Sequence, residues 1–195
     1  MNLKLSSQSL DILADADVVV AGAGAAGVAA ALQAGRMKKK VVLLDKNNCA
    51  GGILTAGLLP SIIHMTDGKN ILSNGLCREL CDNVAKRMNV PVNYNWFNVN
   101  TEVVKIVLDE MLAEAGVQAI YNVHITQALL KRRKIAGLAV MTVKGLMAVT
   151  GKVFIDATGD GLLSMLAGAP FEYGDEITHE VMAPTLCSSF TNINY

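Results

Sequence analysis

The sequence predicts an α/β fold, a parallel sheet wound with helices to which a small antiparallel meander is added. Two continuous apolar runs, Asp17–Ala21 and Val41–Asp45, are typical of strands that are buried on both faces. A glycine-rich turn, Gly22–Gly27, and an alanine-rich helix, Val28–Ala34, lie between them, and Gly35 fits the end of the helix. Strand, helix and strand within about 30 residues form a βαβ unit, which closes right-handed onto a parallel sheet.

The other elements follow from the period of the apolar residues. In chain order they are a helix at Asn74–Met88, a helix at Thr101–Ala115, a strand at Val117–Tyr121, three short strands within residues 123–150, a buried strand at Val153–Ala157 and a helix at Leu162–Ala167. Asn100 or Thr101 can cap the start of the second of these helices. Residues 46–72 lack a clear period and are predicted to form a loop with short helical pieces, whereas residues 184–195 are strand-like.

Composition excludes several classes of protein. Hydrophobic residues make up 52% of the chain and charged residues 17%, which rules out a disordered tail or linker. Lys+Arg and Asp+Glu both count 17, so the net charge of zero argues against attraction to nucleic acid or an anionic membrane. The longest apolar stretch, Val18–Leu32, is shorter than the roughly 20 residues that a membrane span needs.

The same composition predicts a cytoplasmic protein. The start of the chain has no cationic flank followed by an apolar core, so no secretory signal is expected. Four scattered cysteines are too few for a disulfide scaffold, and none has the spacing of a zinc ligand set. No metal site is expected.

The glycine-rich turn carries a nucleotide-binding motif. Gly22, Gly24 and Gly27 match GxGxxG between a predicted strand and a predicted helix, which is the context that the motif requires. The first glycine allows the tight turn, the second lets a pyrophosphate approach the backbone, and the third lets helix and strand pack closely. Ala25 and Ala26 belong to this turn, and the free N–H groups at the N-terminus of the helix that follows favour a phosphate.

An acidic residue completes this motif. Asp45 ends the second strand, where a carboxylate can accept hydrogen bonds from an adenosine ribose. Because it would repel a 2′-phosphate, the predicted nucleotide is FAD or NAD rather than NADP. The alternative is a glycine turn in an ordinary βαβ unit with no ligand.

Two further segments resemble a known family. Cys49–Leu58, CAGGILTAGL, is similar to the GG-x-x-T-x-G signature of the FAD-dependent oxidoreductases of the glutathione-reductase-like fold. Asp156–Gly161, with Leu166–Phe171 behind it, resembles the second FAD motif of the same proteins. The resemblance runs from about Asp17 to the end of the chain, and it is specific for FAD but not for a substrate. It implies a Rossmann-like FAD/NAD(P)-binding domain.

The resemblance also implies which residues hold FAD. They are Gly22, Gly24 and Gly27 at the pyrophosphate, Asp45 at the adenosine ribose with Lys46 beside it, Gly51, Gly52 and Thr55 on the approach to the ribityl chain and flavin, Val123 at the adenine through its backbone, and Ala157, Thr158, Gly159 and Asp160 in a second turn near the cofactor. Asp160 has an alternative role as the N-cap of the helix that follows. No residue is assigned a catalytic role.

The expected function is a flavin-dependent oxidation in which FAD accepts a hydride from an unidentified small molecule. The alternative is a non-catalytic subunit or fragment that holds FAD or its ADP half. An NAD-binding dehydrogenase domain is a third possibility, but the Gly51–Gly52 loop and the Thr158–Asp160 turn together argue against it. The expected domains are a lead-in at 1–16, an FAD-binding domain at 17–180 and the start of a truncated substrate-domain segment at 181–195.

The chain departs from the family pattern in two respects. Members of the fold usually add a Gly-Asp segment that contacts the flavin and a substrate domain, so we expect a second chain or a further C-terminal region to complete the flavin site. Flavin disulfide reductases place a spaced cysteine pair near the loop that corresponds to Gly51–Gly52, whereas this chain has the single Cys49 there.

Other reactive side chains receive structural interpretations. His64 could face the flavin as a base, but an exposed loop position is the favoured interpretation. His124 is expected to be structural and His179 solvated. Cys77 and Cys81 lie four residues apart on one helix face, where packing is favoured over a redox pair.

Overall fold

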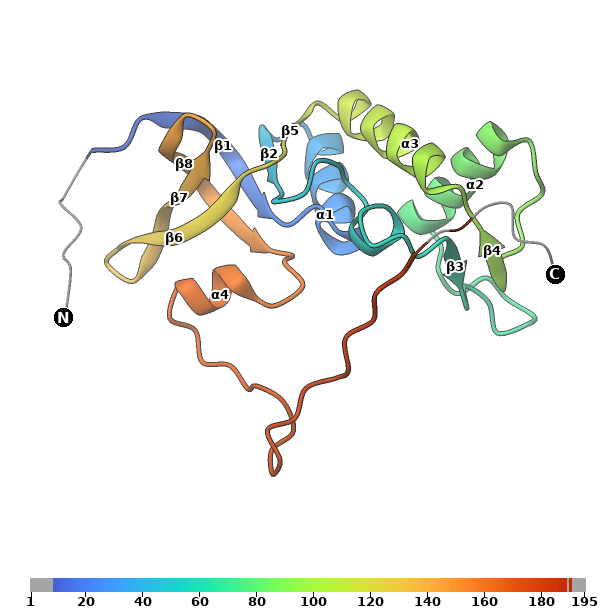
Figure 1. Ribbon diagram of the computed structural model, residues 1–195. Helices are drawn as coiled ribbons and strands as arrows, with labels where there is room; N and C mark the ends of the chain where they lie inside the picture. Colours follow the sequence, from blue (N-terminus) through green and yellow to red (C-terminus); the bar gives the residue numbers. More distant parts are fainter. Residues whose placement is uncertain (1–8, 189, 191–195) are drawn as a thin grey trace.

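A six-stranded sheet with the order β5-β2-β1-β8-β7-β6 forms the centre of the structure, a computed structural model that describes residues 9–188 and 190 (Figure 1). Its strands are β1 (Ile12–Ala21), β2 (Val41–Leu44), β5 (Val117–Ile120), β6 (His124–Lys131), β7 (Lys134–Thr142) and β8 (Gly145–Asp156). β5, β2, β1 and β8 are parallel neighbours, and β6 and β7 extend the sheet as antiparallel strands. The predicted α/β fold with a parallel sheet and an added meander is therefore confirmed.

The apolar strands supply a core on each face of the sheet. Because side chains alternate along a strand, Val20 and Leu43 join one buried cluster while Val19 and Val42 join the other. The first cluster is covered by the helices α1 (Ala25–Arg36), α2 (Leu76–Met88) and α3 (Thr101–Glu114). The second is closed by the meander and by the short helix α4 (Leu162–Leu166). Burial on both faces explains why these strands are continuously apolar.

The strand β8 is longer than predicted. The third meander strand and the buried strand at Val153–Ala157 were expected to be separate, but β8 is continuous: its residues 145–150 pair with β7 and its residues 148–156 pair with β1. Gly151 lies between the two expected strands and marks a close contact, because a Cβ atom there would lie 2.7 Å from a methyl group of Val19. A glycine inside a strand often marks a site of close approach.

The strand β1 begins earlier than predicted. It starts at Ile12 rather than Asp17, because its polar residues alternate with the buried Ala14 and Ala16. The hydroxyl of Thr150 donates to the carboxylate of Asp15 at 2.5 Å, so this exposed acid has a hydrogen-bond partner at the sheet surface. The alternation is that of a half-buried strand, and it was misinterpreted as a polar lead-in.

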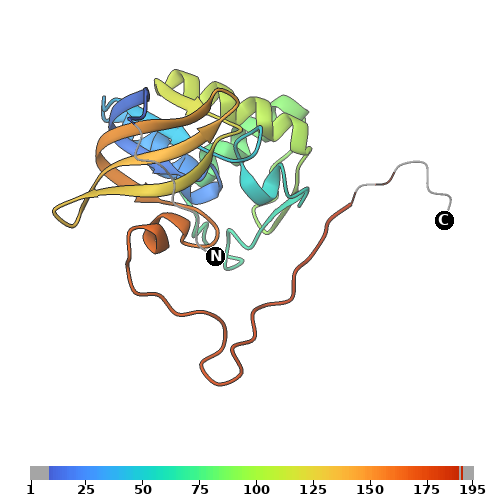
Figure 2. The ribbon, with the colours of Figure 1, turned by 60° about the vertical axis from the view of Figure 1, so that its left-hand side comes forward.

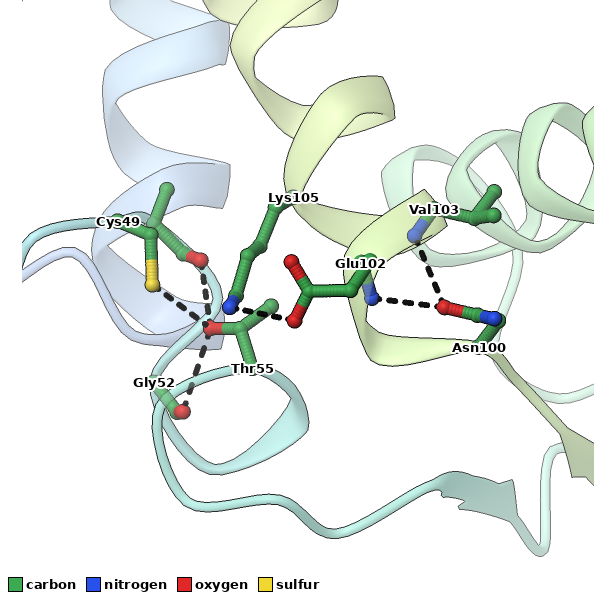
Figure 3. A network of polar contacts seen from close by, with 8 residues as sticks. Cys49, Gly52, Thr55, Asn100, Glu102, Val103 and Lys105 are labelled. Atoms are coloured by element: carbon green, nitrogen blue, oxygen red, sulfur yellow. Dashed lines mark hydrogen bonds and ion pairs between the residues drawn. The ribbon is translucent and has the colours of Figure 1, made fainter.

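The segment between β2 and α3 contains a small second sheet. Its strands β3 (Ser61–Ile63) and β4 (Trp96–Asn98) pair in antiparallel fashion, and three residues are too few to show a period in the sequence. The short 3-10 helix η1 (Gly52–Leu54) is the helical piece predicted within 46–72. The start of α3 is capped as predicted, since the Asn100 side chain accepts hydrogen bonds from the N–H groups of the second and third residues beyond it (Figure 3).

The chain after α4 leaves the body of the molecule in an extended path without regular secondary structure (Figure 2). The strand predicted for residues 184–195 is wrong for 184–188 and 190, and its other residues lie outside the described part. Within the described residues, no helix combines the length and the apolar character needed to cross a membrane.

Candidate cofactor site

A groove of about 520 Å³ opens where β1, β2 and β8 end. Since these strands are parallel neighbours, the turns that follow them meet at one edge of the sheet. The groove brings together twelve of the fifteen predicted cofactor residues: Gly22, Gly24, Ala25, Ala26, Asp45, Lys46, Gly52, Val123, Ala157, Thr158, Gly159 and Asp160. Gly27, Gly51 and Thr55 do not line it.

Two of the motif glycines are required by packing. Gly22 has φ +94°, and a Cβ atom there would lie 2.6 Å from the carbonyl oxygen of Ala157. A Cβ atom on Gly27 would lie 1.7 Å from the carbonyl oxygen of Gly22. Gly27 therefore holds α1 against the turn and does not reach the groove, as expected for a glycine that lets helix and strand pack closely.

Gly24 differs from its neighbours because nothing in the fold requires a glycine there. Its φ of −69° is open to any residue, and a Cβ atom would meet no atom within 4 Å. The open space belongs to the groove, in front of the first turn of α1. That turn has no side-chain cap and no acidic residue, so its free N–H groups and its positive dipole end face the groove. The residues present thus fit a pyrophosphate group.

The Asp45 carboxylate ties two turns together. One of its oxygens accepts the N–H of Ala23 at 2.5 Å, and the other accepts the N–H of Asn47 at 2.7 Å. A carboxylate has about four lone-pair positions, so two remain for further donors such as ribose hydroxyl groups. The N–H of Val123 donates to the carbonyl oxygen of Asp45 at 3.1 Å, which leaves the Val123 carbonyl as the backbone group for an adenine amine.

The second glycine turn is organised by Asp156, which the sequence analysis missed. One carboxylate oxygen accepts the N–H and the hydroxyl of Thr158, and the other accepts those of Ser164. Burial raises the pKa of Asp156, but these hydrogen bonds outweigh it and hold the pKa below its usual value. An acid at a strand end, two residues before a threonine, is the signal that could have identified this anchor.

The alternative N-cap role of Asp160 is wrong. The N-cap of α4 is Gly161, with φ +63° and no side-chain cap. The hydroxyl of Thr158 accepts the N–H of Leu162 at 2.7 Å, so threonine satisfies the start of this helix. Asp160 is exposed and lines the groove.

Replacing Asp156 with alanine is expected to lower the free energy of unfolding by about 2 kcal/mol at neutral pH, since hydrogen bonds to a charged group are lost. Because folding lowers the pKa of Asp156, its contribution is present above about pH 4 and is lost as the pH falls further. The difference between wild type and variant should shrink accordingly in urea denaturation at acidic pH. Asp160→Ala is the matched control, since this neighbouring side chain makes no hydrogen bond within the described residues. Equal losses in the two variants would contradict the role of Asp156.

The loop that carries Gly51 and Gly52 is stabilised by Thr55, whose side chain is fully buried (Figure 3). Its hydroxyl donates to the carbonyl oxygen of Ala50 at 2.6 Å and accepts the Cys49 thiol. Gly51 has φ +108° and donates its N–H to Ala23 at 2.8 Å, which docks the loop on the first glycine turn. The expectation that Gly51 and Thr55 line the groove is corrected: they shape the loop that presents Gly52.

The histidines and the two cysteines of α2 differ in burial and in whether they line the groove. His124 was expected to be structural, but it is exposed and lines the groove, whereas the exposed His64 does not. His179 is exposed, as expected. Burial raises the pKa of Cys77, and burial together with the neighbouring thiol raises the pKa of Cys81 to about 12. Both groups are therefore thiols at neutral pH, which supports packing over a reactive redox pair.

Comparison with known proteins shows which proteins the chain is similar to. Residues 17–195 match the family described as FAD dependent oxidoreductase. The mitochondrial dihydrolipoyl dehydrogenase of Macaca fascicularis is 39% identical over 75 residues, which are 34% of this chain and 15% of the relative. The corresponding human protein is 38% identical over 71 residues, 32% of this chain and 14% of the relative. The chain thus matches only about one seventh of the length of these curated relatives.

Solved structures share the fold at low identity. The OxyS anhydrotetracycline hydroxylase from Streptomyces rimosus has a TM-score of 0.59 and 15% identity, covering 83% of this chain and 35% of that chain. The L-proline dehydrogenase from P. horikoshii has a TM-score of 0.58 and 13% identity, covering 80% and 56%. At such identities the likeness shows the fold alone.

Proposed function

Since the chain belongs to the FAD dependent oxidoreductase family, we propose that it forms the FAD-binding part of an enzyme that oxidises a small organic molecule. One observation carries the proposal: two glycine turns and a strand-end carboxylate, from three neighbouring strands, open onto the same groove. FAD, when bound, supplies the hydride acceptor, while the protein supplies binding and orientation.

The pyrophosphate is assigned to the start of α1. The Cβ-free surface of Gly24 lets a phosphate approach the backbone, and the uncapped N–H groups of Ala25 and Ala26 face it. The dipole of a twelve-residue helix adds a positive end at the same point. Gly22 and Gly27 contribute indirectly, by fixing the turn that carries Gly24.

The two ends of the cofactor are assigned to the remaining turns. The free lone pairs of Asp45 are directed to the adenosine ribose, with Lys46 beside them, and the carbonyl of Val123 is directed to the adenine. The turn Ala157–Asp160 and Gly52 lie toward the flavin end. Asp156 is a positioning residue, because it holds this second turn through four hydrogen bonds.

The wider assignments support the same proposal. We assign residues 17–180 to the FAD-binding domain and 181–195 to the start of a substrate-domain segment, with a small molecule as substrate. A cytoplasmic location remains the prediction from composition and cysteine use.

The absorption spectrum of the purified chain tests this proposal. We expect oxidised-flavin bands near equimolar with protein, and we expect the flavin released on denaturation to be FAD. Anaerobic addition of a small molecule that the enzyme oxidises should bleach the bands. Protein that is colourless after incubation with FAD and gel filtration would contradict the proposal.

A further inference from the structure

Three sulfur atoms lie together between α2 and the loop that follows β3. The Cys81 thiol lies 3.5 Å from the Met65 thioether, and the Cys77 thiol lies 4.0 Å from the same atom. Cys77 and Cys81 are four residues apart on α2, so both side chains extend from one face of the helix. Met65 and Cys81 are buried, whereas Cys77 is exposed and provides a path from solvent.

This spacing suits a three-coordinate metal ion. Metal–thiolate bonds of about 2.3 Å place the ligands of a trigonal site about 4 Å apart, close to the two separations observed. Thiolate and thioether ligands select soft ions such as Cu(I). No group of three or more His, Cys, Asp or Glu side chains in the described part of the chain could complete a harder site, such as that for zinc.

We propose that Met65, Cys77 and Cys81 form a three-sulfur binding site for a soft monovalent cation of the Cu(I) type, separate from the cofactor groove. Binding forms three metal–sulfur bonds and breaks two S–H bonds. The two protons pass to solvent, and neither metal nor sulfur changes oxidation state.

The surrounding structure holds the ligands in place. The backbone of Met65 is fixed on both sides, because its N–H donates to Tyr94 at 3.0 Å and its carbonyl accepts the N–H of Leu72 at 2.8 Å. Cys77 is the second residue of α2, where the positive end of the helix favours a bound thiolate. Cys77 also lines an apolar cavity of about 270 Å³ between α1, α2 and α3, whose walls include Leu76 and Leu80. These walls are mostly apolar and include no carboxylate or imidazole that would compete for the ion.

Silver ion tests the site, because Ag(I) mimics Cu(I) without redox chemistry that would disturb a flavin. The full chain, loaded with FAD, is mixed with excess Ag(I) and passed through a desalting column in the presence of excess glutathione. We expect one silver ion per chain to be retained by the three-sulfur site, while isolated thiols lose theirs to glutathione. Retained silver and flavin are measured on the same fractions.

Variants assign the retained ion. Cys77→Ser is expected to remove it, and Met65→Leu, which conserves volume, is expected to weaken it about tenfold or more. Cys49→Ser and Cys187→Ser are the controls and should retain the ion. Circular dichroism measures whether each variant folds. Cys81 is buried, so Cys81→Ser can fail to fold. Cys77 is exposed, so Cys77→Ser is expected to fold and tests the site by itself. No retention by wild type, or retention unchanged in Cys77→Ser and Met65→Leu, would overturn the proposal whatever the flavin content.

Discussion

Replacing Gly24 with valine is expected to abolish FAD binding while leaving the fold intact. A Cβ atom at this position meets no protein atom within 4 Å and projects into the groove, where the proposal places the pyrophosphate. Even Gly24→Ala should weaken binding by at least about tenfold, roughly 1.4 kcal/mol. Flavin content after gel filtration and the thermal unfolding midpoint are measured on the same samples.

Two further variants separate binding from folding. Ala113→Val places the same side chain on the exposed face of α3 and should change neither flavin content nor stability by much. Gly27→Ala should instead unfold the protein or lower its midpoint strongly, because its Cβ would lie 1.7 Å from a backbone oxygen. Normal flavin content in Gly24→Val would show that the pyrophosphate does not lie against this turn.

The second large effect is expected at Asp45, which should make the chain prefer ADP over 2′,5′-ADP by tenfold or more. A 2′-phosphate would place like charges together and would displace ribose hydroxyls from the two free lone pairs. Asp45→Asn should weaken ADP binding by about tenfold, roughly 1.4 kcal/mol, and remove most of the preference. Isothermal titration of the flavin-free chain with both nucleotides measures the two effects.

Asp17→Asn is the matched control for this experiment. Asp17 also accepts a backbone N–H, from Lys40 at 3.0 Å, but it lies on β1 away from the end that opens onto the groove. The Asp17→Asn substitution should leave the preference for ADP over 2′,5′-ADP unchanged. Equal or tighter binding of 2′,5′-ADP by the wild-type chain would show that Asp45 does not face the ribose.

Local patterns in the sequence were sufficient to predict the βαβ unit and the elements around it. The apolar runs of β1 and β2 and the N-cap of α3 depend on neighbours in the chain, so propensity and periodicity identify them. The groove follows from this, because parallel strands must end at one edge. For that reason twelve residues predicted from motifs line one groove, although they come from turns far apart in the sequence.

The predictions that failed depend on contacts between distant residues. The continuity of β8 through Gly151 was not predicted, because the reason for a glycine there, the nearby Val19 methyl group, is on another strand. Thr55 was expected in the groove, but its hydroxyl bonds to Ala50 behind the loop. Asp156 was placed in the second motif but given no role of its own, since its partner Ser164 lies in the helix beyond the turn. Such partners become visible only once the strands are placed.

A titration of the flavin-free chain with FAD and with FMN tests most directly whether the groove binds the cofactor through its ADP half. Asp45 and Val123 are assigned to the AMP part of FAD, which FMN lacks, and FMN offers only one of the two phosphates that are assigned to the turn at Gly24. We therefore expect FAD to bind at least about tenfold more tightly than FMN, roughly 1.4 kcal/mol, and ADP to compete with FAD. Equal affinity for FMN and FAD, with no competition by ADP, would contradict the account.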